Sequence, residues 1–137
     1  MKCVELNPKG NFDPWESSKV QELKEQQVSK SLGQKLLFEN ENMLVWEVVL
    51  FPQERLPFRK QSTNYCWVSH TNGLVISRRG DGKINMIHLK KGDSQFFKAE
   101  DTNYISDLEN IGENLIFINI MEFKPLIKKT ETISKAR

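Results

Sequence analysis

The sequence predicts an all-β fold, a small barrel or sandwich, with one short N-terminal helix. From Lys35 onward, short runs of β-branched and aromatic residues alternate with turn residues. Asn72-Gly73 is a hairpin signal, and the stretch 80–82 (Gly-Asp-Gly) lies between two alternating runs as a tight hairpin requires. Helical spacing is found in one stretch, within residues 13–27. Short strands with such regular turns are typical of a β-sandwich or small barrel.

The first 34 residues are predicted to form an arm and a short helix. Residues 1–12 are polar and contain proline and glycine, so we expect little regular structure there. Asp13 is a suitable helix cap and Pro14 a favourable first helical residue. Helical spacing then follows at three apolar positions, Trp15, Val20 and Leu23. We expect this apolar stripe to cover an edge of the barrel rather than to bind a partner.

Residues 35–124 are predicted to form one barrel domain, and residues 125–137 a polar tail that is rich in lysine. No internal repeat indicates a second barrel. Each expected strand is a short run of strand-forming residues bounded by turn residues. The expected strands are Lys35–Phe38, Met43–Leu50, Asn64–His70, Gly73–Arg79, Lys83–Lys90, Ser94–Lys98, Asn103–Leu108 and Leu115–Glu122.

Composition bounds the function. A chain of 137 residues is long enough to fold as one domain without disulfide or metal support. The 20 basic and 18 acidic residues nearly cancel, which argues against nucleic acid or an anionic membrane as the main partner. Cys3 and Cys66 form no zinc-like pattern and favour a reducing, cytoplasmic setting. The sequence has neither a membrane-length apolar run nor an apolar signal-peptide core, so a soluble, unexported protein is expected.

Five short motifs occur in order between residues 36 and 124: LLFENENMLVWEVVL, PQER, LKKGD, ENIGE and IFINIMEFK. In this order they resemble the strand that enters the barrel, the P-G-E turn, the glycine-aspartate turn, the closing N-x-G and the final strand of a small single-domain cupin. The resemblance implies a cupin-like jelly-roll β-barrel. It also implies a homodimer, because cupins often pair through their sheets.

The resemblance further implies where metal ligands would lie. In cupins the P-G-E turn precedes H-x-H and then a carboxylate, and these groups suit Mn, Fe, Ni or Zn. Counted from Pro52, the two histidine positions hold Arg59 and Gln61, and the carboxylate position holds Tyr65 or Cys66. An arginine stays protonated in proteins and would repel a divalent ion. We therefore expect a barrel that has lost its metal ligands.

The third histidine position and the turn glycine are also replaced. Counted back from Asn110, the histidine position holds Ser106, whereas counted forward from Gly92 it holds Asn103. Gln53 takes the place of the turn glycine, which costs backbone freedom if the turn needs a positive φ.

The two histidines of the chain, His70 and His88, are isolated in the sequence. Two histidines without a third ligand make a poor transition-metal site. We expect both to be structural or surface residues, and we predict no metal and no cofactor.

The mouth of the barrel is the candidate site for a small molecule. Arg59 would pair with a carboxylate or phosphate, since a guanidinium presents a planar donor fork. The other candidates are Gln61, Tyr65, Ser106 and Asn103 for hydrogen bonds, with Trp46 or Trp67 as a wall. Alternatively, bulk such as Phe58 closes the pocket and Arg59 faces solvent, which leaves a structural or interaction protein. An inward Arg59 would need an anionic ligand or a partner such as Glu54.

Glu47 interrupts the apolar run LVWEVVL, and strand parity cannot assign its face because both faces are apolar. Buried, it would be an acid or an ion-pair partner of Arg59 or Arg78; otherwise it lies at a sheet edge. A metal-independent enzyme of the isomerase type would need a base and an acid across the pocket. Glu47 with Tyr65 or Cys66 is the pairing that the sequence offers, so whether the protein is an enzyme stays open.

Overall fold

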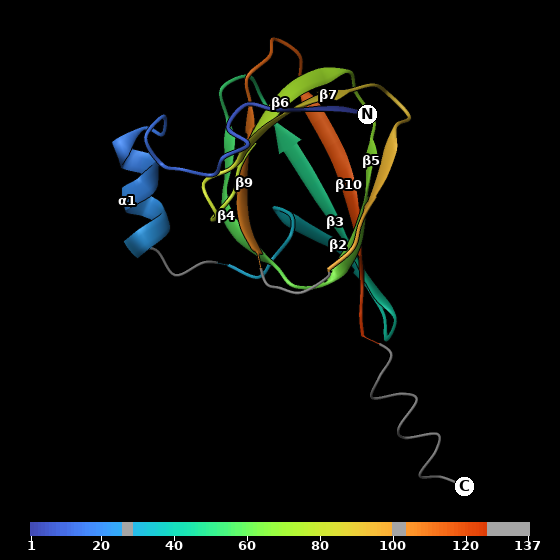
Figure 1. Cartoon of the computed structure of the whole chain (residues 1–137). Coiled ribbons are helices and arrows are strands. Elements are labelled where there is room, and N and C mark those ends of the chain that lie inside the picture. The colour runs from blue at the N-terminus through green and yellow to red at the C-terminus, as the bar shows by residue number, and fades with distance from the viewer. Residues whose placement is uncertain (26–28, 100–103, 126–137) are drawn as a thin grey trace, which may run out of the picture.

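The computed structural model of the protein describes residues 1–25, 29–99 and 104–125. Within these ranges, two five-stranded antiparallel sheets face each other and one helix lies outside them (Figure 1). No helix in these ranges has the length and apolarity to cross a bilayer. The elements are β1 Lys2–Glu5, α1 Ser17–Glu25, β2 Lys35–Glu39, β3 Met43–Leu50, β4 Arg55–Gln61, β5 Asn64–Ser69, β6 Gly73–Arg78, β7 Ile84–Leu89, β8 Ser94–Phe97, β9 Tyr104–Asn110 and β10 Ile116–Phe123.

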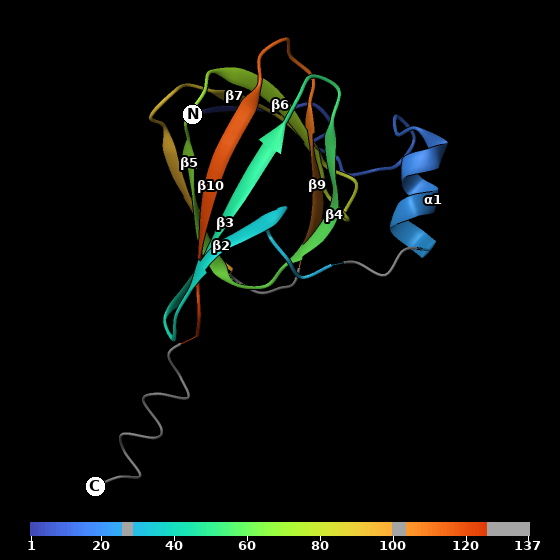
Figure 2. The same cartoon turned by 180° about the vertical axis from the view of Figure 1, so that it is seen from behind.

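The predicted all-β barrel with one short helix is confirmed. The first sheet has the strand order β1-β7-β6-β9-β4, and the second has the order β2-β3-β10-β5-β8. Strands from distant parts of the chain therefore lie side by side, and β10 occupies the centre of the second sheet (Figure 2). This interleaved order is that of a jelly roll, in which two sheets enclose one core.

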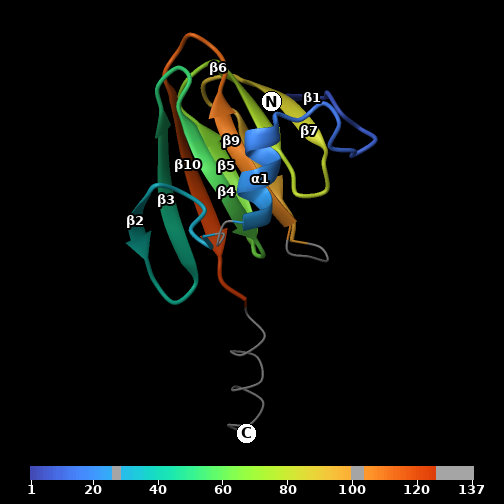
Figure 3. The same ribbon diagram turned by 90° about the vertical axis from the view of Figure 1, so that its left-hand side faces the viewer.

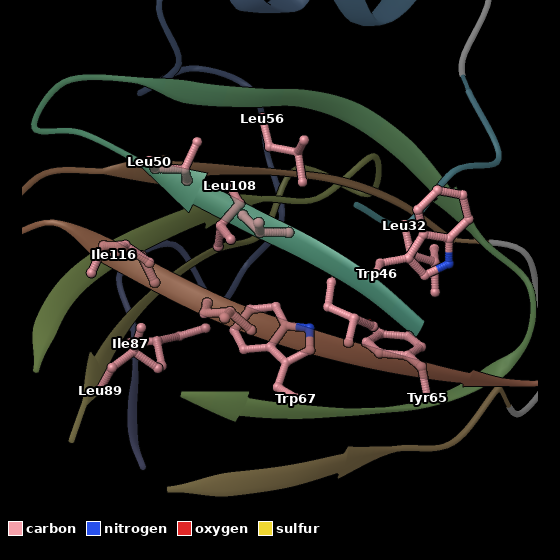
Figure 4. Close-up of a cluster of buried hydrophobic side chains, with 14 residues drawn as sticks. Leu32, Trp46, Leu50, Leu56, Tyr65, Trp67, Ile87, Leu89, Leu108 and Ile116 are labelled. Carbon is pink, nitrogen blue, oxygen red and sulfur yellow. The ribbon is translucent and has the colours of Figure 1, made fainter. Parts of the chain in front are cut away.

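The core forms where alternate residues of β3 and β10 point between the sheets. Trp46, Val48 and Leu50 of β3 are buried, and the same holds for their register partners on β10. These partners are Ile120, Ile118 and Ile116. The strict alternation gives each strand one buried face, because successive side chains in a strand point to opposite sides. Each fully buried aliphatic side chain stabilises the fold by about 1.5–3 kcal/mol before entropy is counted. Figure 4 shows Trp46, Leu50 and Ile116 within this cluster of buried side chains.

The eight strand predictions are confirmed to within two residues at each end, but two further strands were not predicted. The expected irregular arm is wrong over Lys2–Glu5, because this segment is β1, which pairs with the edge of β7. Its ordering comes from a tertiary partner that local polarity does not reveal. The division of the chain at residues 34/35 and 124/125 stays a prediction, and 126–137 lie outside the described ranges.

The second missed strand is β4, which contains Pro57 and three basic side chains. Proline cannot donate a ladder hydrogen bond and is therefore confined to edges and bulges. Here β4 is the edge of the first sheet, and its register with β9 shifts between Leu56 and Arg59. Pro57 lies inside this irregular step, which explains how a strand with a proline can form.

The helix prediction is correct in kind but not in its start. α1 begins at Ser17, four residues after the expected cap Asp13, and residues 26–27 of the expected helix lie outside the described ranges. Trp15 therefore precedes the helix. It is buried, its Nε1 donates to the Gly82 carbonyl at 2.9 Å, and its ring stacks on Phe58 at 6.1 Å between centroids. Trp15 thus anchors the segment that leads into α1.

An ion-pair network holds α1 against the first sheet. Arg55 donates from both terminal nitrogens to Glu22 of the helix, at 2.9 and 2.8 Å. Its Nε donates to Asp107 at 2.6 Å, and Arg78 donates to the same Asp107 oxygen at 2.8 Å and to Glu109 at 2.8 Å. Each guanidinium therefore has carboxylate partners, as buried charges require. Figure 3 shows α1 standing in front of this sheet.

A buried asparagine closes one end of the barrel. Asn110 is fully buried, and its Nδ2 donates to the carbonyls of Leu50 at 2.9 Å and Asn114 at 2.8 Å. Its Oδ1 accepts from the Gly112 amide at 3.0 Å, and its own carbonyl accepts from the Gln53 amide at 2.9 Å. This is the closing N-x-G motif, and it fastens the β3–β4 turn to the β9–β10 turn.

That turn contains the backbone strain expected at the lost glycine. Gln53 has φ 73°, in the left-handed region that favours glycine, and its side chain is exposed. A non-glycine residue in this region costs about 1–2 kcal/mol, partly offset because glycine loses more chain entropy on folding.

We expect Gln53→Gly to raise the free energy of unfolding by about 0.5–1 kcal/mol, because it relieves this strain. Urea denaturation of the two proteins measures the change. Gln53→Ala keeps a Cβ and is the matched control, which should leave stability close to that of the unmodified chain. An equal gain in both variants would show that the Gln53 side chain, and not its φ, is responsible.

Candidate ligand-binding cavity

A cavity of about 290 Å³ lies between the two sheets, and we call it the barrel cavity. A smaller space of about 30 Å³, the Arg59 recess, shares Tyr65, Trp67, Ser77 and Ser106 with it, so the two spaces adjoin. The barrel cavity is also lined by Met1, Cys3, Arg79, Asn85, Ile87, Gln95 and Phe97. The recess is also lined by Arg59, Gln61, Asp107, Leu32, Leu56, Leu108 and Ile120.

The irregular step in β4 sets which residues face the recess. After the register shift, Arg59 pairs with Ser106 and Gln61 with Tyr104. Arg59 and Gln61 line the recess, two residues apart, as the strand period requires. Gln61 is buried and its Oε1 accepts from the Ser106 hydroxyl at 2.8 Å. The structure therefore brings together five of the residues that the sequence suggested for the site, namely Arg59, Gln61, Tyr65, Trp67 and Ser106.

The Arg59 guanidinium is half-buried. It forms no ion pair with a carboxylate in the described part of the chain. Its Nε is buried and makes no hydrogen bond to any of those residues. Burial lowers the pKa of the Arg59 guanidinium below its ordinary value. Asp107 lines the same recess, but its carboxylate is held by Arg55 and Arg78. Glu54, a partner that the sequence offered, instead accepts from the Phe51 amide at 2.7 Å.

The opposite wall of the barrel cavity is aromatic. Tyr65 stacks on Phe97 with 4.8 Å between ring centroids, and Trp67 lies tilted against the same ring at 5.1 Å. Tyr65 and Trp67 alternate on β5 and point between the sheets (Figure 4). On another side, Asn85 of β7 presents a buried Oδ1 with no hydrogen-bond partner in the described part of the chain.

The cupin metal positions do not fit a metal ion. Tyr65, not Cys66, takes the inward carboxylate position, since Cys66 lies on the outer face opposite Met121. A guanidinium and the side chains of glutamine, tyrosine and serine offer no histidine or carboxylate ligand. Asn103, the alternative third position, lies outside the described residues. Within the described ranges, no three side chains of His, Cys, Asp or Glu are placed to hold a metal ion.

The two histidines of the chain lie away from this cavity. His70 is exposed and contacts Asn119 Oδ1 at 2.6 Å through its Nε2. His88 is exposed on β7. Neither lines the barrel cavity or the Arg59 recess.

Two of the predicted site residues, Glu47 and Trp46, line neither the barrel cavity nor the Arg59 recess. Glu47 alternates with the buried residues of β3, so it faces outward, opposite Asn119 and Lys35. The alternative in which Glu47 is buried and pairs with Arg59 therefore does not hold, and Glu47 and Tyr65 lie on opposite faces of the second sheet. Trp46 points inward but packs in the core, where its Nε1 donates to Glu122 at 2.8 Å.

The sequence reasoning missed several cavity residues. Ser77 and Arg79 follow Val75 at every second position in GLVISRR, and this alternation places them on the face of buried Val75. That alternation was a usable signal. Asn85 and Phe97 gave none, because their strands have no clear alternation in the sequence.

Solved structures of other proteins share this architecture. A cupin domain from Bordetella pertussis matches 73% of this chain and 99% of its own length, with a TM-score of 0.60 and 17% identity. The chain has the cupin fold. An RmlC-like cupin with a double-stranded β-helix fold from Methanocaldococcus jannaschii matches 77% of this chain and 91% of its own (TM-score 0.55, 16% identity). The cupin domain of Schizosaccharomyces pombe Cnp3 matches 72% and 68% (TM-score 0.53, 12% identity).

These likenesses concern the cupin fold alone, because fewer than one residue in five is identical. No protein-family model matches the sequence, and no curated protein matches it. Function must therefore be argued from the cavity itself.

Arg59 and Arg55 lie on one strand and should respond oppositely to loss of charge. We expect Arg59→Met to leave the free energy of unfolding unchanged or higher, because it removes a half-buried charge that lacks a partner. Arg55→Met should lower the free energy of unfolding by about 1–3 kcal/mol, because Glu22 and buried Asp107 each lose a cationic partner. Urea denaturation in a buffer without carboxylate or phosphate measures both. A comparable loss in Arg59→Met would show that Arg59 already has a partner.

Proposed function

We propose that the protein binds a small organic anion in the barrel cavity, with Arg59 as the anion-binding residue. The observation that carries this proposal is the half-buried Arg59 guanidinium, which has no carboxylate partner among the described residues. A buried charge without a partner is costly, and an anionic ligand would supply one.

The surroundings of Arg59 support an anion more than a cation. A guanidinium forms two parallel hydrogen bonds to a carboxylate or phosphate, which gives strength and geometric specificity. Ser106 and Gln61 add polar groups beside it, and the aromatic wall provides apolar contact. Ligand sites usually combine apolar walls with a few polar groups in this way. We further propose that the barrel works without a metal ion; a reducing, cytoplasmic setting stays a prediction from the sequence.

Native mass spectrometry of untagged protein, purified without chelator, tests this function. We expect each chain to carry a small organic adduct, which is lost or reduced at least tenfold in occupancy in Arg59→Gln. Lys60→Gln is the matched control, because Lys60 is the neighbouring cation on β4 and does not line the cavity. Equal retention in both variants would contradict a role for Arg59. One metal ion per chain by elemental analysis would overturn the metal-free proposal.

We also propose that two copies of the chain pair through the outer face of the second sheet. An unbroken apolar row crosses all five strands of this face in register: Phe38, Val45, Met121, Cys66 and Phe96. Phe38 is 52% exposed and Phe96 is 54% exposed. Phe123 lies beside Phe96, with 6.4 Å between ring centroids. We call this surface the outer apolar row.

The size of this face suits a homodimer. Five strands spaced about 4.8 Å apart and four to eight residues long cover roughly 500 Å² per copy, or about 1,000 Å² in total. That area is at the lower limit of specific interfaces. Exposed apolar side chains gathered in one continuous row are more typical of an interface than apolar side chains scattered singly.

We expect Phe96→Glu to shift the protein from dimer to monomer in sedimentation velocity, because two-fold pairing would bury the new charge. Phe51→Glu is the control, since Phe51 is 59% exposed but lies in the β3–β4 turn, outside the row. A monomer in the unmodified protein, or a dimer that survives Phe96→Glu, would contradict pairing through this face.

A further inference from the structure

We propose that the anion bound in the barrel cavity is an aromatic monocarboxylate with a hydroxyl group on its ring. This inference rests on the proposed anion-binding function and names the chemical class of the ligand. Three features of the described cavity and its recess carry it: one guanidinium without a carboxylate partner, a flat aromatic wall, and a buried acceptor that lacks a donor. Arg79 also lines the barrel cavity, but its charge is paired with that of Asp81 at 3.0 Å.

The charge in the recess favours a monoanion. Arg59 is the guanidinium that lines the recess, and the Asp107 carboxylate lines it too. Asp107 forms ion pairs with both Arg55 and Arg78. Neither of these arginines is therefore free to balance a second negative charge on a ligand. A planar carboxylate matches one guanidinium fork, whereas a phosphate dianion would meet repulsion from Asp107 that one arginine must offset.

The opposite wall favours a flat ring. Tyr65, Trp67 and Phe97 form a contiguous aromatic surface, with 4.8 and 5.1 Å between neighbouring centroids. Aromatic rings prefer offset-stacked or edge-to-face contacts at such separations, so a ligand ring gains more here than a flexible chain of equal area.

The volume fits one substituted ring. The barrel cavity is about 290 Å³, larger than the roughly 150 Å³ of an apolar cavity known to accept benzene. Acetate would leave most of this space unfilled.

Asn85 favours a donor on the ligand. Its Oδ1 is buried at the cavity and has no hydrogen-bond partner in the structure's described ranges. An apolar ligand that excluded water from this atom would leave it unsatisfied, which is costly, whereas a ring hydroxyl could donate to it. The ligand should therefore carry a hydrogen-bond donor apart from its carboxylate.

Isothermal titration calorimetry of the unliganded protein tests this class with acetate, phosphate, benzoate, benzamide and the 3- and 4-hydroxybenzoates. We expect benzoate to bind at least tenfold more tightly than acetate, phosphate or the uncharged benzamide. One hydroxybenzoate isomer should bind at least threefold more tightly than benzoate. This extra gain should vanish in Asn85→Leu, which should bind benzoate at least as tightly as the unmodified protein does because no unsatisfied oxygen remains.

Two further variants assign the contacts. Arg59→Gln should weaken benzoate at least tenfold, with Lys60→Gln as the unaffected control. Phe97→Leu should weaken benzoate at least threefold while leaving acetate unchanged. Phe97 is half-buried on the edge strand β8, so the fold should survive, which circular dichroism checks.

The outcomes separate this inference from the function on which it rests. Acetate or phosphate binding as tightly as benzoate, and lost in Arg59→Gln, would overturn the aromatic class and leave the anion-binding function standing. Equal binding of benzoate and both hydroxybenzoates would overturn the role of Asn85. Failure of every anion, together with an adduct-free native mass spectrum, would overturn both proposals.

Discussion

The closed end of the barrel depends on one buried amide. Asn110 is fully buried, yet its side chain bonds to Leu50, Gly112 and Asn114 while its backbone bonds to the β3–β4 turn. Because a buried amide must satisfy its donors and acceptor, this arrangement admits one relative placement of the two turns. The sheets are thereby held together at this end, and the strained Gln53 is held in its turn by the same contacts. The barrel cavity lies between walls that this closure keeps in register.

The two arginines of β4 show how one strand serves two purposes. Arg55 lies on the outer side, where burial alone would lower its pKa but hydrogen bonds to Glu22 and Asp107 raise it above its ordinary value. Arg59 follows the register shift and enters the recess, where burial acts on it without a carboxylate to compensate. The difference between Arg55, which is ion-paired, and Arg59, the proposed ligand-binding cation, therefore comes from the irregular step around Pro57 and not from any difference in side-chain chemistry.

Local patterns were enough to predict eight of the strands and the cupin-like order of motifs, because alternation and turn residues act over a few neighbours. The segments that failed depend on distant partners. β1 is ordered by β7, about 80 residues away, and the inward turn of Arg59 depends on the pairing of β4 with β9. Glu47 shows the same limit, since its neighbours are apolar on both sides and only the sheet decides its face. Motif counting selected Arg59, Gln61 and Ser106, and the structure puts these three side chains at one recess because loop lengths between strands are constrained.

The central position of β10 in the second sheet determines when that sheet can form during folding. β3 and β5 do not pair with each other; both pair with β10, the last strand described. Until β10 has been made, the second sheet exists only as two separate strand pairs, β2–β3 and β5–β8, each with an open edge. Native pairing must then wait for contacts between distant parts of the chain, which makes folding slow. During synthesis on the ribosome, the edges of β3 and β5 therefore stay unpaired until β10 emerges, and in this interval the chain is most prone to aggregate.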